Sequence, residues 1–160
     1  MRILGTGSAL PINEVPNTAF SAVVDTSDEW ISTRTGILSR RIATDETALS
    51  LAREASERAL TASGVSRGDI ALVICATVTN ETLTPSLACL LQRELNLRES
   101  ILAFDINAAC TGFIYSLALA SSLLRQGERA LLVGCEVLSR VTDFTDRATC
   151  VLFGDGAGAV

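Results

Sequence analysis

The sequence predicts an α/β fold in which a mostly parallel, mixed sheet is flanked by helices. Two continuous apolar runs, residues 69–77 and 129–138, have the composition of central parallel strands buried on both faces. Segments with helical periodicity lie before and between them, and the clearest spans residues 47–63. Strands that alternate with helices of this length favour a layered α/β fold over an all-α or all-β one.

The first quarter of the chain is predicted to form a strand, a short helix and a better marked second helix. Residues 2–10 are expected to be the strand, and residues 17–24 the short helix. The second helix has Ser27 or Asp28 as its N-terminal cap, because both side chains can accept hydrogen bonds from free backbone N–H groups. Gly36 is expected to end it.

The helix over residues 47–63 carries alanines at steps of four and three, and Gly64 is expected to end it. The narrow stripe consists of Ala48, Ala52, Ala55, Ala59 and Ala62. It predicts close packing on the sheet. A further helix is expected to open at Pro85 and to run to about Leu95, with Cys89 packed in the core.

The second half of the chain repeats the pattern of strand and helix. An apolar run begins at Ile101, passes through a turn of small residues, and becomes a helical segment from Phe113 to Leu124. The strand over residues 129–138 is followed by a polar loop over residues 139–149. The glycines of residues 150–160 are expected to allow close packing of the backbone.

The composition limits the classes of protein to which the chain can belong. The chain has 160 residues, 48% hydrophobic and 19% charged, which is typical of one globular domain. The net charge of −5 argues against nucleic-acid binding. It contains no histidine and no lysine, since all 13 basic residues are arginines. A Ser-His-Asp triad, Schiff-base chemistry and a phosphate-loop lysine are therefore excluded within this chain.

The cysteines and the apolar runs indicate the cellular compartment of the protein. Five cysteines are widely spaced without a C-x-x-C pair, which fits a reducing environment and argues against a disulfide framework or a metal site. No apolar stretch approaches the ~20 residues that a membrane span requires. We therefore expect a cytoplasmic protein without a membrane segment. Because the chain stops on an apolar run, we also expect residues 1–160 to be one half of a longer protein.

Cys110 is the first candidate for chemistry. A strand, a tight turn and a helix in that order put it at a helix N-terminus, where exposed N–H groups favour a thiolate. Its small neighbours Ala108, Ala109 and Gly112 leave room for a substrate to approach the sulfur. The pattern is typical of an activated nucleophile on an elbow. A buried cysteine that packs as a small hydrophobe is an equally good interpretation of the pattern alone.

Trp30 and Arg34 are a second candidate pair. They are four residues apart and so share one face of the predicted helix. A tryptophan beside an arginine can stack on a flat ring while the guanidinium binds phosphate. The residues alone favour a simpler arrangement, in which Trp30 anchors the helix to the core and Arg34 is solvated.

Three motifs carry a resemblance to a known family. They are D-T-S-D-E-W-I at residues 25–31, N-A-A-C-T-G at residues 107–112 and F-G-D-G-A-G at residues 153–158. In this order and spacing the chain closely resembles β-ketoacyl-acyl-carrier-protein synthase III, the initiating condensing enzyme of type II fatty acid synthesis. The resemblance covers essentially all 160 residues and corresponds to the N-terminal half of that family's thiolase-like fold.

The resemblance implies a two-stage reaction. Cys110 would attack an acyl-CoA thioester and release CoA; malonyl-acyl-carrier protein would then lose CO₂ and condense with the acyl group. Acyl-CoA is a substrate here, and no cofactor or metal is expected. The family's other catalytic residues, a histidine and an asparagine, lie in the C-terminal half. This fragment alone is therefore expected to be inactive in condensation. The resemblance also implies a homodimer.

The resemblance also assigns substrate contacts, and for Trp30 and Arg34 it replaces the simpler arrangement. Trp30 would stack on the CoA adenine, with Arg147 on the other side of that ring. Arg34, Thr26 and Thr35 would surround the nucleotide and its phosphates. Thr84 replaces a bulky aromatic residue found in acetyl-preferring members, so the acyl pocket is expected to accept longer or branched chains.

The sequence leaves three further functions open. A related enzyme could use the same priming cysteine and pass the acyl group to an amine, a hydroxyl or another carbon nucleophile in secondary metabolism. The chain could also be a non-catalytic half that completes a partner's site. A thiol redox sensor ranks last, because no resolving cysteine lies near Cys110 in the sequence.

Overall fold

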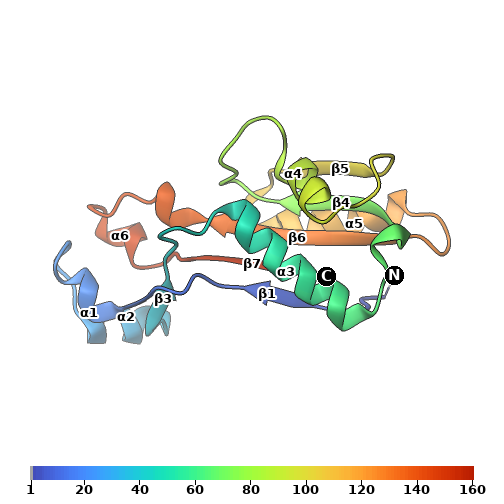
Figure 1. Ribbon diagram of the computed structural model, residues 1–160. Helices are drawn as coiled ribbons and strands as arrows, with labels where there is room; N and C mark the ends of the chain where they lie inside the picture. The colour runs from blue at the N-terminus through green and yellow to red at the C-terminus, as the bar shows by residue number, and fades with distance from the viewer. Residues whose placement is uncertain (1) are drawn as a thin grey trace.

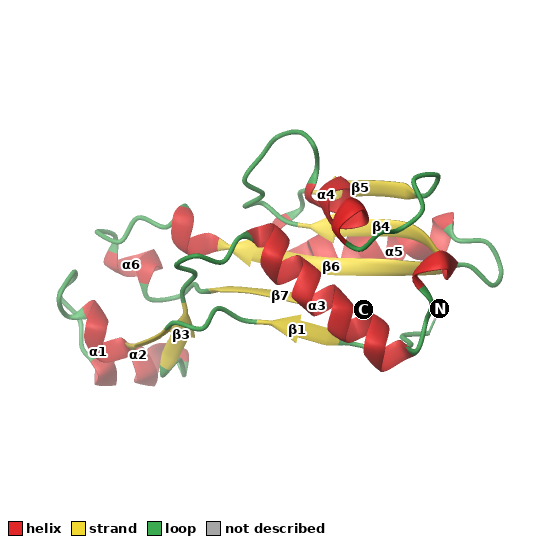
Figure 2. Ribbon diagram, viewed as in Figure 1, coloured by secondary structure: helices red, strands yellow, loops and turns green. Residues whose placement is uncertain are grey.

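The computed structural model describes residues 2–160, which build a five-stranded mixed sheet with helices on both faces (Figures 1 and 2). The strand order is β1-β7-β6-β4-β5. Strand β4 pairs in parallel with both β5 and β6, whereas β7 pairs antiparallel with β6 and with β1. The strands are β1 (Gly7–Ala9), β4 (Ile70–Ala76), β5 (Leu102–Ile106), β6 (Arg129–Val137) and β7 (Asp155–Ala159). The predicted α/β class with a mixed, helix-flanked sheet is confirmed.

Helices cover the two faces of the sheet unequally. Helices α3 (Ala48–Ser63) and α4 (Leu87–Glu94) pack on one face, and α5 (Gly112–Leu123) packs on the other (Figure 1). At one end of the molecule, α1 (Asn17–Phe20), α2 (Asp28–Thr35) and α6 (Arg147–Cys150) gather beside a small ribbon (Figure 2). That ribbon pairs β2 (Glu14–Pro16) with β3 (Ser39–Arg41) in antiparallel register.

Local sequence signals set the helix ends as predicted. The Ser27 hydroxyl accepts a hydrogen bond from the Trp30 N–H at the start of α2, and Gly36 ends that helix with φ 74°. Thr47 and Ser50 form a reciprocal capping box at the start of α3, and Gly64 ends it with φ 66°. Left-handed backbone of this kind costs glycine little, which explains both helix stops.

The core lies in three clusters. The largest joins α3 and α4 to the sheet, and another joins α5 to its opposite face. A small third cluster under α1, α2 and α6 contains Phe20, Ile31, Cys150 and Val151. The predicted alanine stripe of α3 is confirmed at four positions, Ala48, Ala52, Ala55 and Ala59, which are buried. The prediction is wrong for Ala62, which is exposed in the last turn of the helix.

Several predicted elements differ from the structure. Residues 2–6 form no strand, so β1 is shorter than expected, and α1 ends at Phe20 rather than near residue 24. The predicted loop over residues 139–149 contains a 3₁₀ turn and α6, because the Asp146 side chain caps the Ala148 N–H. Cys89 is exposed, since α4 turns its Leu87, Ala88 and Leu91 face to the sheet. No helix within residues 2–160 combines the length and apolar character needed to cross a membrane.

Candidate active site

Three of the candidate residues, Thr84, Cys110 and Arg147, follow strands whose carboxyl ends lie at one edge of the sheet. Because β4, β5 and β6 run in parallel, their carboxyl ends lie at the same edge. The loop with Thr84 follows β4, the Cys110 turn follows β5, and the segment with Arg147 follows β6. In open α/β sheets, ligands bind outside the carboxyl ends of the strands. This edge is therefore the place where a site can be assembled.

Cys110 lies on a sharp turn between β5 and α5. It is exposed, within a 3₁₀ turn over Ala109–Thr111. Ala109 has φ 46°, a left-handed conformation that a residue with a side chain adopts only when its surroundings enforce it. The N–H and the hydroxyl of Thr111 both donate to the Ala108 carbonyl, at 3.2 and 2.7 Å. The elbow predicted from sequence is present, and its cysteine is not a core residue.

The end of β5 is anchored beside that elbow. Asp105 is half-buried and accepts hydrogen bonds from the N–H groups of Leu87 and Ala88, at 2.7 and 2.8 Å, in the first turn of α4. Burial raises the pKa of Asp105, and these two hydrogen bonds oppose the rise. On the other side, Gly112 packs so closely on β4 that an added Cβ would lie 3.0 Å from the Ala76 Cβ. Two contacts thus fix the segments on either side of Cys110.

The remaining cysteines are distinguished by burial. Cys75, Cys135 and Cys150 are buried, and burial raises the pKa of each thiol, that of Cys135 to about 12. Because the thiolate is the nucleophile, burial disfavours reaction at these three thiols. Cys89 is exposed, with its Sγ 3.6 Å from the Ala103 carbonyl oxygen. Among residues 2–160, only Cys89 and Cys110 present an exposed thiol.

Trp30, Arg34 and Arg147 form a cluster, called here the Trp30 cluster. The Cζ of Arg34 lies 4.6 Å from the Trp30 ring centroid, and the Cζ of Arg147 lies 4.0 Å from it. Arg34 shares helix α2 with Trp30, whereas Arg147 comes from α6. Both distances are within the range of cation–π attraction. The structure thus brings together three of the residues predicted from sequence, from two distant segments.

The three predicted threonines have different surroundings. Thr26 is half-buried, and its Oγ1 is buried without a hydrogen-bond partner within residues 2–160. The Thr35 hydroxyl donates to the Ile31 carbonyl at 2.7 Å and accepts from the Ile37 N–H at 3.0 Å, so it closes the last turn of α2. Thr84 is exposed, in the loop between β4 and α4. It lies on a different segment from the Trp30 cluster.

A buried polar pair behind the cluster was not predicted. Asn17 and Arg40 are 1% and 6% exposed, and the Arg40 Nη2 donates to the Asn17 Oδ1 at 3.0 Å. Arg40 is followed in the sequence by Arg41, whose side chain instead forms an ion pair with Glu14. Alternation along β3 turns the two arginines to opposite sides. A strand of three residues gives too short a pattern for the sequence to tell which arginine is inside.

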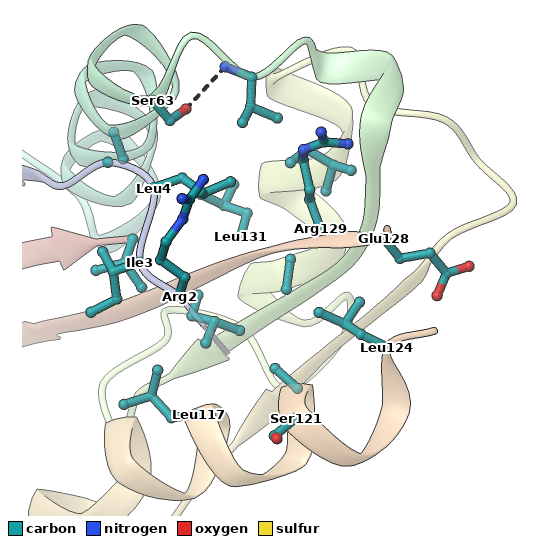
Figure 3. A pocket seen from close by; sticks show the side chains of 18 of the residues that line it. Arg2, Ile3, Leu4, Ser63, Leu117, Ser121, Leu124, Glu128, Arg129 and Leu131 are labelled. Carbon is teal, nitrogen blue, oxygen red and sulfur yellow. Dashed lines mark hydrogen bonds between the residues drawn. The ribbon is translucent and has the colours of Figure 1, made fainter. Parts of the chain in front are cut away.

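A cavity of about 410 Å³ lies at the end of the sheet where strands β4 and β6 begin (Figure 3). Leu4, Leu117, Leu124 and Leu131 are among its lining residues, together with the charged side chains of Arg2 and Arg129. It includes Ile70 and Arg129, the first residues of β4 and β6. The cavity is therefore separate from the edge that carries Cys110.

Comparison with known proteins agrees with this geometry. The family model for 3-oxoacyl-[acyl-carrier-protein] synthase III matches residues 104–160. The β-ketoacyl-[acyl-carrier-protein] synthase III of Alkalilimnicola ehrlichii is 53% identical over 99% of this chain and 50% of its own length. That of Clostridium acetobutylicum is 49% identical over 100% of this chain and 50% of its own length. The chain thus spans about half the length of the curated relatives it matches.

Solved structures give the same result. The crystal structure of 3-oxoacyl-[acyl-carrier-protein] synthase III from Aquifex aeolicus has a TM-score of 0.94 and 48% identity, over 99% of this chain and 52% of that one. The priming β-ketosynthase of a polyketide pathway has a TM-score of 0.93 and 43% identity, over 99% of this chain and 48% of that one.

The chain has the fold of one half of these synthases, a thiolase-like α/β fold. Within that class it matches the N-terminal half of a β-ketoacyl-[acyl-carrier-protein] synthase III. The resemblance drawn from the three sequence motifs is confirmed.

Proposed function

We propose that the protein containing this chain takes an acyl group from acyl-CoA onto Cys110 and starts fatty acid synthesis with it. The observation that carries the proposal is the exposed thiol on the Ala109 elbow, directly before α5. The Cys110 sulfur attacks the thioester carbonyl carbon, the bond from that carbon to the CoA sulfur breaks, and CoA leaves as a thiol. Backbone N–H groups, including that of Cys110, stabilise the oxyanion formed on the way.

The Trp30 cluster supports a site for the nucleotide of CoA. The adenine stacks on Trp30, and because Arg147 lies only 4.0 Å from that ring, its guanidinium moves aside to cover the other face of the base. Arg34 binds phosphate. The unpartnered Thr26 hydroxyl supplies a hydrogen bond, whereas Thr35 holds the end of α2 that carries Arg34.

The second stage needs residues outside this chain. Malonyl-acyl-carrier protein loses CO₂, and its carbanion attacks the acyl carbon on Cys110, which frees the thiol and forms the ketoacyl product. The chain contains no histidine that could assist the decarboxylation. Residues 1–160 are accordingly an N-terminal half that is inactive in condensation on its own, and the other half supplies the missing groups.

The enzyme acts as a cytoplasmic homodimer in this proposal. Strand β5 supports the dimer, because it lies at an edge of the sheet and exposes Leu102. The backbone of such an edge can pair with a second copy. Thr84, in the loop before α4, borders the acyl pocket and leaves room for long or branched chains.

A second candidate function keeps the acylation of Cys110 and changes the acceptor. The similarity to a priming β-ketosynthase of a polyketide pathway favours this second candidate over a scaffold or a redox sensor. In that case the acyl group starts a secondary metabolite rather than a fatty acid.

A condensation assay tests the proposal and separates the two candidates. The longest natural form of the protein is mixed with acyl-CoA and malonyl-acyl-carrier protein, and free CoA, CO₂ and ketoacyl-carrier protein are measured. We expect all three products, and none from the Cys110→Ala variant. CoA release without the ketoacyl product contradicts condensation with malonyl-acyl-carrier protein and favours transfer of the acyl group to a different acceptor. The absence of CoA release from every acyl-CoA contradicts both.

A further inference from the structure

A buried cation lies in the small core cluster beneath the Trp30 cluster. Arg40 forms no ion pair with a carboxylate among residues 2–160, although it is only 6% exposed. Its guanidinium lies 4.3 Å from the Phe20 ring centroid, and its Nε and Nη1 have no hydrogen-bond partner among those residues. Burying a charge without a counter-ion is costly, and an apolar side chain would fill the same space at less cost. The contacts that Arg40 does make therefore call for an explanation.

Those contacts link helix α2, which carries Trp30 and Arg34, to helix α6, which carries Arg147. The Arg40 Nη2 donates to the Asn17 Oδ1 at 3.0 Å and to the Val151 carbonyl oxygen at 2.8 Å. Val151 directly follows α6, the helix that carries Arg147.

Asn17 extends this chain of hydrogen bonds to α2. Its Nδ2 donates to the Asp28 Oδ1 at 2.8 Å, in the first turn of α2, and to the Ile37 carbonyl oxygen at 2.7 Å, just beyond the end of that helix. Asn17 thus holds both ends of the helix that carries Trp30 and Arg34. The path from α2 to α6 runs through two buried side chains, those of Asn17 and Arg40.

Helix α6 depends on such a support. It has four residues, of which only Cys150 is buried, and it follows an exposed polar segment. A helix this short is not stable by itself, so its position is set by tertiary contacts. The hydrogen bond from Arg40 to Val151 and the packing of Cys150 and Val151 in the small core supply them.

We propose that Arg40 and Asn17 are positioning residues for the CoA site. They hold α6 against α2 so that the Arg147 guanidinium faces the Trp30 ring, and they set the affinity for the nucleotide of acyl-CoA without touching it. The inference rests on the proposed CoA site, and it assigns to two residues a role in substrate affinity that their burial alone does not reveal.

The test uses the longest natural form of the protein with variants of Arg40, Asn17 and Arg41. Arg40→Met removes both hydrogen bonds of the guanidinium. Asn17→Asp keeps an acceptor for Arg40 but removes the amide donor to Asp28 and Ile37. Arg41→Met is the matched control, because Arg41 lies on the same strand and contacts Glu14, Pro11 and Ile12 rather than α2 or α6.

Two quantities are measured: the Kd for CoA by calorimetry, and the rate of acylation at saturating acetyl-CoA. We expect Arg40→Met and Asn17→Asp each to raise the Kd about tenfold or more, as loss of a buried charged hydrogen bond does. The acylation rate at saturation stays within about twofold, because the elbow of Cys110 is unchanged. Arg41→Met leaves both quantities unchanged, and Arg40→Lys, which keeps the charge without the planar fork, has an intermediate Kd.

Trp30→Ala and Arg147→Ala distinguish the two levels of the proposal. If neither raises the Kd for CoA, the proposed CoA site itself is wrong. If both do while Arg40→Met and Asn17→Asp keep the original Kd, the positioning role is wrong. A parallel loss of thermal stability and of acylation at saturation in both variants also overturns it, because the pair then only supports the fold. Should Arg40→Met not fold, Asn17→Asp, which keeps an acceptor for the Arg40 guanidinium, decides the outcome.

Discussion

Cys110 and Cys135 contain the same thiol in opposite surroundings. Cys135 is 1% exposed on β6, and burial raises its pKa to about 12, whereas Cys110 is exposed at the turn before α5. The sequence predicted this distinction only in part: an elbow of small residues pointed to Cys110, but Cys89 was predicted to be buried and is not. Neighbouring positions of a helix point in different directions. Hydrophobic periodicity predicts that direction less well for residues at the border of the buried face.

Alkylation at pH 8 is expected to separate the cysteines. Iodoacetamide should modify Cys110 and leave Cys75, Cys135 and Cys150 unmodified until the protein unfolds, because their thiolates are disfavoured by burial. Peptide mapping by mass spectrometry gives the extent of modification at each cysteine. Rapid modification of Cys135 in the folded protein would contradict the packing described above.

The raised pKa of Cys135 also predicts a direction for alkaline stability. The folded state keeps this proton at a pH where the unfolded state has lost it, so the folded state binds more protons between pH 9.0 and about 12. The free energy of unfolding should therefore decrease as the pH rises through this window. Urea unfolding at several pH values measures it, and the Cys135→Ala variant should show a weaker dependence.

Thr84 allows a prediction about chain length. If Thr84 borders the acyl pocket as proposed, Thr84→Phe in the longest natural form of the protein should lower kcat/KM for medium-chain acyl-CoA about tenfold or more and leave acetyl-CoA nearly unaffected, because the ring occupies the space for the chain. Leu83→Phe is the matched control, since Leu83 is the exposed neighbour in the same loop. Unchanged use of medium chains by Thr84→Phe would show that Thr84 does not border the acyl pocket.

At the scale of elements, glycines decide how closely α3 packs on the sheet. A Cβ on Gly7 would lie 2.1 Å from the Ala55 carbonyl oxygen, so β1 and α3 touch through their backbones. In the predicted glycine-rich strand, a Cβ on Gly156 would have a neighbour at 2.9 Å, whereas one on Gly158 would have no atom within 4 Å. The Gly156 neighbour is the Leu10 Cδ2, so the prediction of close backbone packing is right at Gly154, where a Cβ would lie 3.1 Å from the Arg41 carbonyl oxygen, and wrong at Gly158.

Gly7 and Gly158 give a paired test of packing. Gly7→Ala should lower the free energy of unfolding by about 1–3 kcal/mol or more, since backbone atoms of α3 must move. Gly158→Ala, one strand away, should change it by less than about 1 kcal/mol. Chemical denaturation of the two variants measures both values, and equal losses would contradict the close contact between β1 and α3.

Elements with long, regular patterns could be predicted, and short ones could not. Helix α3 follows directly from its periodicity and from Thr47 and Gly64, and strands β4 and β6 follow from their continuous apolar runs. Strand β3 and helix α6 have three and four residues, too few to show a period, and depend on contacts with distant residues such as that between Arg40 and Val151. The Trp30 cluster depends on α6, so Arg147 entered the predicted site through the family resemblance and not through its own sequence context.

At the scale of the whole molecule, α5 carries more apolar surface than one sheet can cover. Ile114, Tyr115 and Leu123 are exposed on it, and Leu117, near its middle, and Leu124, directly after its end, line the cavity of Figure 3. Exposed apolar surface of this kind marks a contact region. It agrees with a chain that matches half the length of its relatives.

The central claim is that Cys110 accepts an acyl group from CoA. Intact-mass spectrometry of the longest natural form, after incubation with acetyl-, branched-chain or medium-chain acyl-CoA, tests it directly. The Cys89→Ala variant is the matched control, because Cys89 is the other exposed cysteine among residues 2–160. We predict a single hydroxylamine-labile acyl adduct that persists in Cys89→Ala and is absent in Cys110→Ala. A folded protein that gains no adduct from any donor, or that keeps its adduct in Cys110→Ala, would contradict the claim.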